Sequence, residues 1–266
     1  LTMGQVNDVL AVASLQVNLL WEDVPGNLAK FTSIIDSLTT KVDLVVMPEM
    51  FTTGFSMNPE KLAEEMDGVT NTWLMDQAQK RGVALVGSFI VKEKGEYYNR
   101  LVFTEPSGVQ HIYDKHHLFR IGEEHNHYGR GTQRLIVNYL GWRIRPLICY
   151  DLRFPVWSRN RNDYDMLLYV ANWPESRRDV WSTLLKARAI ENQACLIGVN
   201  RVGSDGTGLT YSGDSVMLNA KGQSLAASIK SHEEVLIARF SKIELDAFRR
   251  KFPVWMDADD FSIGAP

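Results

Sequence analysis

The stretch GWRIRPLICYDLRFP, residues 141–155, indicates both how the chain folds and where its chemistry is placed. An apolar run from 144 to 148, broken by Arg145 and Pro146, is typical of a buried strand and ends at Cys149. A charged, aromatic turn follows, and we expect a helix after it. Helix N-terminal amides and nearby cations favour the thiolate of a cysteine placed in this way, and the thiolate is the reactive form. The stretch therefore predicts an enzyme with a covalent intermediate on Cys149; if the thiol is inert, the stretch is only a strand and a turn.

The composition is that of an ordinary folded protein. Of 266 residues, 45% are hydrophobic and 23% are charged, enough for a large core. The net charge is -3 and no long basic run occurs, so we expect no nucleic-acid partner. No apolar run approaches the roughly 20 residues of a membrane helix, and the first ten residues do not resemble a secretory signal. The two cysteines, Cys149 and Cys195, make no disulfide framework, so we expect a cytoplasmic protein.

Strand-like and helix-like segments alternate along the chain without a linker or a repeat. The pattern predicts strands at 9–16, 42–47, 83–91, 97–104, 108–113, 135–139, 142–149, 166–170, 194–200, 214–219, 224–228 and 235–240, and helices at 27–38, 70–81, 178–192 and 243–250. Gly82 is the expected stop of the second helix. Hairpins mixed with strand–helix–strand units indicate one α/β domain over residues 1–266, with a mixed rather than a purely parallel sheet.

For each of three further residues the sequence allows two interpretations, one chemical and one structural. Glu49 follows the run 43–48, where burial raises the pKa of a carboxylate as a general base requires; the alternative is an exposed loop carboxylate. Lys115 can stabilise an oxyanion or a thiolate, or be a solvated surface lysine. Arg153 can bind a substrate carboxylate as a two-pronged donor, or form a structural ion pair.

Other motifs favour structural roles. Five of the six histidines fall between residues 111 and 127, but their spacing matches no reliable ligand pattern, so we expect no metal site. The run GSDGTG at 203–208 resembles a phosphate-binding loop, yet no helix signal follows it, which indicates a turn. Cys195 lies in an apolar run and is expected to be buried and inert. The seven tryptophans are expected in the core or at an interface rather than around a cofactor.

Taken together, Glu49, Lys115 and Cys149 resemble the Glu-Lys-Cys triad of the nitrilase superfamily of carbon–nitrogen hydrolases. The motifs that carry the resemblance run in order over nearly the whole chain: PEMFTTGF at 48–55, YDKHHLF at 113–119, ICYDLRFP at 148–155, KARAIENQ at 186–193 and YSGDS at 211–215. The resemblance implies a four-layer α-β-β-α sandwich that forms homodimers. A second set of motifs is similar to those of the family branch of ω-amidases that act on 2-oxoglutaramate. These motifs are FRIGEEHNHY at 119–128, CYDLRFPVWSRN at 149–160, VANWPESR at 170–177 and KFPVWMDADDF at 251–261.

The resemblance also implies a mechanism. Cys149 attacks the amide carbon, Glu49 is the general base, and Lys115 with the backbone amide of Tyr150 stabilises the oxyanion. A thioester forms on Cys149, and neither a metal nor an organic cofactor is needed. A second glutamate positions the substrate; Glu123 and Glu124 are both available, and Glu124 is favoured because it precedes a histidine as in that branch.

The expected substrate is a small dicarboxylic monoamide. Arg153 would hold its far carboxylate, and Tyr150, Asn172, Trp173 and Phe55 would contact it or line the pocket. A nitrilase or an N-carbamoyl-amino-acid amidohydrolase with the same triad is an alternative. A catalytically silent binding or scaffold protein is a third hypothesis, although it would need a damaged triad.

Overall fold

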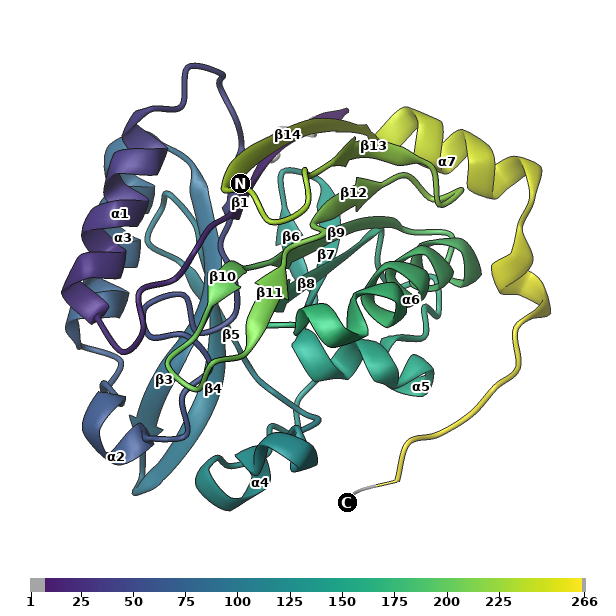
Figure 1. Ribbon diagram of the computed structural model, residues 1–266. Coiled ribbons are helices and arrows are strands. Elements are labelled where there is room, and N and C mark those ends of the chain that lie inside the picture. The colour runs from purple at the N-terminus through teal and green to yellow at the C-terminus, as the bar shows by residue number, and fades with distance from the viewer. Residues whose placement is uncertain (1–7, 265–266) are drawn as a thin grey trace.

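The computed structural model describes residues 8–264, which form two six-stranded sheets stacked face to face (Figure 1). The first sheet has the order β14 (Glu234–Ser241), β1 (Val9–Gln16), β2 (Leu44–Val46), β3 (Ala84–Glu93), β4 (Glu96–Thr104) and β5 (Gln110–Asp114). The second has the order β13 (Ser224–Ala227), β12 (Val216–Leu218), β9 (Cys195–Asn200), β8 (Met166–Ala171), β7 (Trp142–Ile148) and β6 (Val137–Tyr139). A separate hairpin joins β10 (Val202–Ser204) to β11 (Thr210–Ser212).

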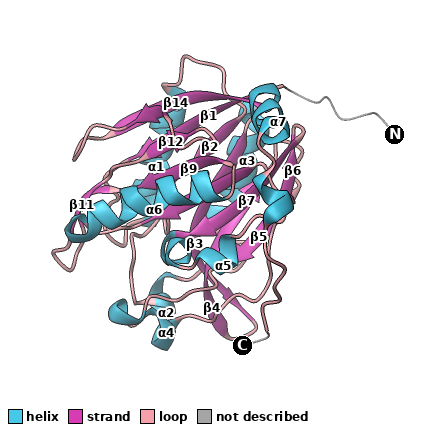
Figure 2. Cartoon of the chain, turned by 90° about the vertical axis from the view of Figure 1, so that its right-hand side faces the viewer, coloured by secondary structure: helices cyan, strands magenta, loops and turns pink. Residues whose placement is uncertain are grey.

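The two sheets share one plan. Each has three parallel strands at its centre, β1–β2–β3 in the first and β7–β8–β9 in the second, with antiparallel strands outside them. Parallel neighbours need crossover connections, and helices supply most of them. Helices α1 (Val24–Asp36) and α3 (Val69–Arg81) cover the first sheet, and α6 (Arg178–Glu191) lies across the outer face of the second (Figures 1 and 2). The remaining helices are α2 (Pro59–Leu62), α4 (Glu124–His127), α5 (Pro155–Ser158) and α7 (Lys242–Lys251).

Local signals explain where the two helices on the first sheet begin and end. Asp23 caps α1 by accepting a hydrogen bond from the Gly26 N–H at 2.9 Å, and Pro25 lies in the first turn. The expected stop of α3 is confirmed, because Gly82 adopts a left-handed conformation with φ 63°.

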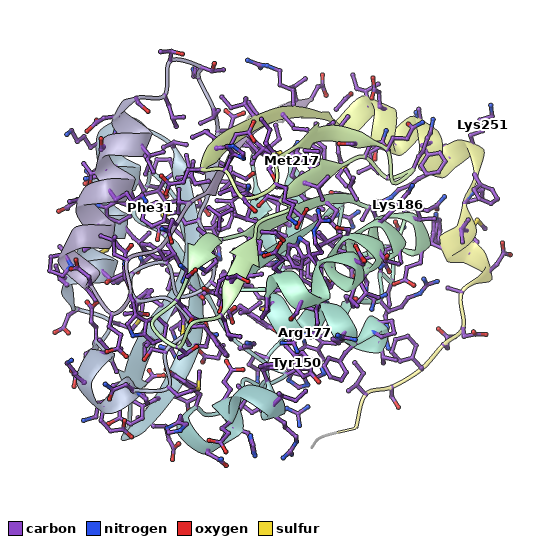
Figure 3. The ribbon with its side chains drawn as sticks, viewed as in Figure 1. Phe31, Tyr150, Arg177, Lys186, Met217 and Lys251 are labelled. Carbon is purple, nitrogen blue, oxygen red and sulfur yellow. The ribbon has the colours of Figure 1, made fainter. Side chains whose placement is uncertain are left out.

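Side-chain alternation along the strands separates the layers. Within β1, Leu10 and Val12 join the core between the sheets, whereas Ala13 and Leu15 face the helices. Figure 3 shows Phe31 of α1 pointing from the helix towards the first sheet. The predicted four-layer α-β-β-α sandwich is confirmed, and the mixed sheet expected from the pattern is in fact two mixed sheets.

Several local expectations needed correction. The helix predicted after Cys149 is a five-residue 3₁₀ turn, Cys149–Arg153, followed by the short α5. The run 203–208 is a turn as predicted, but it joins two short strands that the sequence pattern did not reveal. No helix within residues 8–264 combines the length and apolar character needed to cross a bilayer. The single domain predicted over 1–266 extends beyond the described residues at both ends and stays a prediction.

Candidate active site

Four polar or reactive side chains follow the ends of four strands and meet between the sheets. Glu49 comes shortly after β2 and Lys115 directly after β5 in the first sheet, while Cys149 follows β7 and Asn172 follows β8 in the second. In open α/β sheets, the carboxyl ends of the parallel strands are where functional groups gather. Because the two sheets stack face to face, residues that are far apart in the sequence come together.

Glu49 is completely buried, so the alternative of an exposed loop carboxylate is wrong. Its Oε1 accepts hydrogen bonds from Lys115 Nζ and Asn99 Nδ2, both at 2.8 Å. Its Oε2 accepts the backbone N–H of Asn172 at 2.8 Å. These donors come from both sheets, and they hold the carboxylate in one orientation.

Lys115 is equally buried, and the alternative of a surface lysine is wrong. Its ammonium donates to Glu49 Oε1 at 2.8 Å and to Glu124 Oε1 at 3.0 Å, and it lies 5.0 Å from the centre of the Phe55 ring. Burial by itself lowers the pKa of the ammonium. The charges of Glu124 and Glu49 outweigh this effect, so the pKa is raised overall. Lys115 is therefore a fixed cation at neutral pH.

The structure distinguishes the two glutamates that the sequence left open. Glu124 is fully buried against Lys115, and its Oε2 accepts the Phe119 N–H at 2.6 Å, whereas Glu123 is exposed. Burial raises the pKa of Glu124, and the neighbouring charge of Glu49 raises it further against the opposing effect of Lys115. One cation thus compensates two buried carboxyl groups.

Asn99, which sequence reasoning missed, links both carboxyl groups. This fully buried residue of β4 donates its amide to Glu49 Oε1 at 2.8 Å and to Glu124 Oε1 at 3.2 Å. An asparagine close to the apolar run 101–103 of a strand is the signal that could have identified it, because a buried amide needs partners.

Cys149 lies beside this cluster with φ 41°, a left-handed conformation that costs a non-glycine residue energy. Its Sγ is 3.9 Å from the carbonyl oxygen of Asn172. Burial raises the pKa of the thiol well above its usual value, and the charge of Glu49 raises it further, outweighing Lys115. Burial and Glu49 therefore oppose the thiolate, whereas Lys115 favours it as the sequence led us to expect.

The turn that carries Cys149 is fastened by Asp151, a second residue missed from the sequence. The buried Asp151 carboxylate accepts the Ile148 N–H at 3.0 Å, the Tyr113 hydroxyl at 2.7 Å and the His117 N–H at 3.0 Å. The His117 ring also lies 2.8 Å from Asp151, which ties the segment after Lys115 to the turn after Cys149. Within residues 8–264, no group of three or more histidine, cysteine, aspartate or glutamate side chains is arranged to hold a metal ion.

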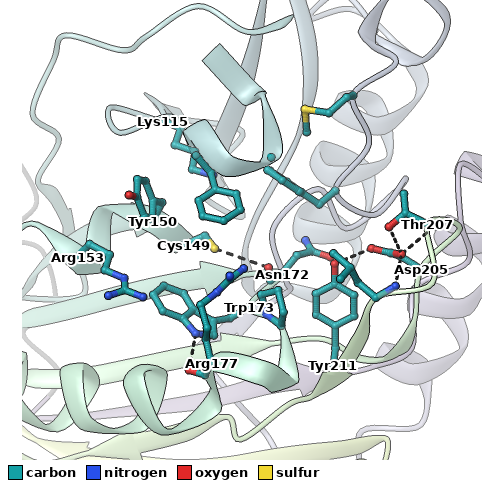
Figure 4. A pocket seen from close by; sticks show the side chains of 16 residues that line it. Lys115, Cys149, Tyr150, Arg153, Asn172, Trp173, Arg177, Asp205, Thr207 and Tyr211 are labelled. Atoms are coloured by element: carbon teal, nitrogen blue, oxygen red, sulfur yellow. Dashed lines mark hydrogen bonds between the residues drawn. The ribbon is translucent and has the colours of Figure 1, made fainter. Parts of the chain in front are cut away.

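A pocket of about 150 Å³ opens next to Cys149 and Lys115 (Figure 4). Its wall includes all five residues expected to contact the substrate, namely Phe55, Tyr150, Arg153, Asn172 and Trp173. The pocket is smaller than those that bind drug-sized ligands, which favours a small substrate.

Arg153 occupies the exposed part of this wall. Its guanidinium lies 5.4 Å from the centre of the Trp173 ring. It makes no ion pair with any residue of the described chain, so the structural ion pair considered for it is wrong. The guanidinium is therefore available to a ligand.

The hairpin of β10 and β11 forms another part of the wall, which sequence analysis missed. Asp205, Thr207, Leu209 and Tyr211 all line the pocket. The glycine-rich run at 203–208 marked the turn in the sequence, but nothing in it indicated that the turn reaches the pocket.

The structural assignments of the tryptophans hold in part. Trp142, Trp157, Trp173 and Trp181 are buried as expected, whereas Trp255 is exposed. Cys195 is buried on β9, and burial raises the pKa of its thiol to about 12, in agreement with an inert role.

A model of the carbon-nitrogen hydrolase family matches residues 11–250. The chain belongs to this family. It is 47% identical to the omega-amidase YafV of Escherichia coli K12, over 96% of this chain and 98% of that one. It is 32% identical to the 2-oxoglutaramate amidase of Bacillus subtilis, over 92% of this chain and 96% of that one.

A solved structure agrees with both the fold and the family. The carbon–nitrogen hydrolase superfamily protein XC1258 from Xanthomonas campestris superposes with a TM-score of 0.94 at 42% identity, over 96% of this chain and 99% of that one. The resemblance to the nitrilase superfamily and to its ω-amidase branch is confirmed by these matches, and so is the prediction of a hydrolase that acts on C–N amide bonds.

Proposed function

We propose that this hydrolase cleaves the terminal amide of a small dicarboxylic monoamide of the 2-oxoglutaramate type, giving a carboxylate and ammonia. The observation that carries the proposal is the Lys115 ammonium held between Glu49 and Glu124, beside a buried thiol at one end of the pocket, with the guanidinium of Arg153 at the exposed part of the same pocket. The relatives named omega-amidase and 2-oxoglutaramate amidase support it.

In the acylation step, Glu49 takes the proton of Cys149 as the sulfur bonds to the amide carbon. The amide oxygen becomes an oxyanion, which Lys115 Nζ and the backbone N–H of Tyr150 stabilise. Glu49 then gives the proton to the nitrogen, the C–N bond breaks, ammonia leaves, and a thioester remains on Cys149. Burial raises the pKa of the resting thiol, which supports a proton transfer to Glu49 during the attack.

In the deacylation step, Glu49 takes a proton from a water molecule, whose oxygen attacks the thioester carbon. The same two donors stabilise the second oxyanion. Removing one donor would raise the activation free energy by about 3 kcal/mol. The C–S bond then breaks and Glu49 returns the proton to the sulfur. The carboxylic acid product gives its remaining proton to solvent and leaves as a carboxylate. Glu124 has a positioning role, because it holds Lys115 from the side opposite Glu49.

The substrate is oriented by its charged end. Arg153 binds the far carboxylate, while Phe55, Tyr150, Asn172 and Trp173 contact the chain between the two ends. A guanidinium without an ionic partner offers two parallel N–H groups that match a carboxylate.

Ammonia release from 2-oxoglutaramate and succinamate tests the proposal. We expect turnover of both, and a thioester adduct on Cys149 by mass spectrometry of the intact protein quenched early in the reaction. Absence of turnover of both amides, or faster turnover of the corresponding nitriles, would contradict it. The homodimer and the cytoplasmic location expected from the sequence stay predictions, and light scattering of the purified protein tests the first of them.

A further inference from the structure

A second arginine, Arg177, lines the pocket and has no function in the mechanism above. It lies directly before α6, and its guanidinium is 5.2 Å from the centre of the Phe119 ring. Its neighbour Arg178 forms an ion pair with Asp214, but Arg177 forms none with any residue between 8 and 264. Figure 4 shows the Arg177 side chain extending into the pocket beside Trp173.

Trp173 connects the two arginines of the pocket. Its indole N–H donates to the carbonyl oxygen of Arg177 at 2.9 Å, and its ring supports the guanidinium of Arg153. Its backbone N–H donates to Asn200 Oδ1 at 2.8 Å, which anchors it to the end of β9. One rigid side chain therefore sets the positions of both cationic residues.

The pocket has little negative charge to balance them. Among the described residues that line it, Asp205 is the only carboxylate. Its Oδ1 accepts from the N–H groups of Thr207 at 2.9 Å and Leu209 at 3.1 Å, and its Oδ2 accepts the hydroxyl of Tyr211 at 2.7 Å. Because these bonds lie within its own hairpin, they occupy the Asp205 carboxylate and leave Arg153 and Arg177 for a ligand.

We infer that Arg177 is a specificity-determining residue that binds the 2-oxo acid end of the substrate together with Arg153. The inference rests on the proposed function and deepens it. A 2-oxo acid presents three acceptor oxygens, two on the carboxylate and one on the ketone, and two guanidinium groups can donate to all three. A 2-amino acid of the same length presents an ammonium group at the position of the ketone, and two nearby cations repel it. The pair therefore selects the 2-oxo monoamide against its 2-amino counterpart, by attraction to one and repulsion of the other.

The first experiment compares kcat/KM for 2-oxoglutaramate, glutaramate and glutamine in the wild type and in R177Q. We expect R177Q to lose roughly 10- to 100-fold on 2-oxoglutaramate and less on glutaramate, which lacks the ketone. Glutamine should show no loss or a gain, because one cation fewer repels its ammonium group. R120Q is the matched control, since Arg120 is exposed beside Phe119 and outside the pocket wall, and it should behave as the wild type. Equal losses on all three substrates, or no loss, would overturn the inference.

The second experiment separates this inference from the proposed function, because it needs no turnover. Calorimetric titration with 2-oxoglutarate and with glutarate gives the two dissociation constants in the wild type, R177Q, R177K and R120Q. We expect the preference for 2-oxoglutarate to disappear in R177Q and to be only partly restored in R177K, which keeps the charge but not the planar fork. An unchanged preference in R177Q with a wild-type thermal unfolding curve rejects the role of Arg177 even if the wild type hydrolyses 2-oxoglutaramate. Loss of the preference supports it even if the wild type hydrolyses none of the amides.

Discussion

The two ends of the pocket solve different electrostatic problems. At the inner end, Glu49, Lys115 and Glu124 are fully buried, and each charge has a hydrogen-bonded partner of opposite sign. At the outer end, Arg153 and Arg177 have no ionic partner in the described chain and rest on aromatic rings. Buried charges must be paired to be tolerated, whereas a cation near solvent can be left for a ligand. Under the proposed function, the inner end breaks the amide bond and the outer end selects the substrate, so substitutions at the two ends should separate these functions.

The largest expected effect is that of removing the nucleophile. Cys149→Ala should reduce amide turnover by at least about 10⁴-fold, because the covalent route is lost entirely. The matched control is Cys195→Ala, since that buried thiol lies away from the pocket wall. Ammonia release measured on both variants tests this prediction; comparable activity of the two would show that the inner end does not act through Cys149.

The next largest effect follows from removing the base. Glu49→Gln should lower kcat roughly 10²- to 10⁴-fold. The same substitution should make the Cys149 thiol easier to ionise, because the charge of Glu49 helps to raise its pKa. The rate of alkylation of Cys149 by iodoacetamide, followed against pH in a Cys195→Ala background, should therefore rise at lower pH in Glu49→Gln than in the parent. A shift in the opposite direction would mean that Glu49 does not act on the thiol.

Glu124 and its neighbour Glu123 provide a matched pair for the positioning of Lys115. Glu124→Gln should lower kcat/KM roughly 10- to 100-fold, the scale of a small misplacement of a catalytic group. Glu123→Gln should have no effect, because that side chain is exposed. Equal effects of the two substitutions on ammonia release would contradict the prediction that Glu124, and not Glu123, positions Lys115.

The same pair predicts a dependence of stability on pH. Burial raises the pKa of Glu124 above its value in the unfolded chain, about 4.3 for a free glutamate. The folded protein therefore binds the Glu124 proton more tightly than the unfolded chain does. The stability gained from this proton is fully present below the unfolded pKa and is lost as the pH rises through the raised pKa of the folded state. Urea unfolding from pH 4 to pH 8 should show the wild type losing stability relative to Glu124→Gln as the pH increases, with Glu123→Gln following the wild type.

How much of this could be predicted from the sequence depends on whether the signal is local. Glu49, Lys115 and Cys149 were identified because their motifs run in the order of the Glu-Lys-Cys triad of the nitrilase superfamily. The local signal alone, an apolar strand before Glu49 and before Cys149, left structural alternatives open. Asn99 and Asp151 were missed because they contact side chains that are distant in the sequence; Asn99 contacts a carboxylate 50 residues away. The turn at 203–208 was predicted, but its place in the pocket wall was not, because the rest of that wall comes from distant segments. The division into two sheets was also hidden from the pattern, since strands buried on both faces lose their alternation. The raised pKa of Cys149 has the same origin, because burial is a property of the assembled layers.

The smallest expected effect lies at the outer end. Arg153→Gln should lower kcat/KM for 2-oxoglutaramate about tenfold, mostly through KM, because a half-solvated ion pair with the substrate is weakened by water and salt. It should leave the turnover of butyramide, an amide without a carboxylate, unchanged, since the inner end is intact. Raising the ionic strength should increase KM for 2-oxoglutaramate in the wild type more steeply than in Arg153→Gln. A variant that instead lost kcat equally on both amides would place Arg153 with the bond-breaking groups, and the separation between the two ends of the pocket would no longer hold.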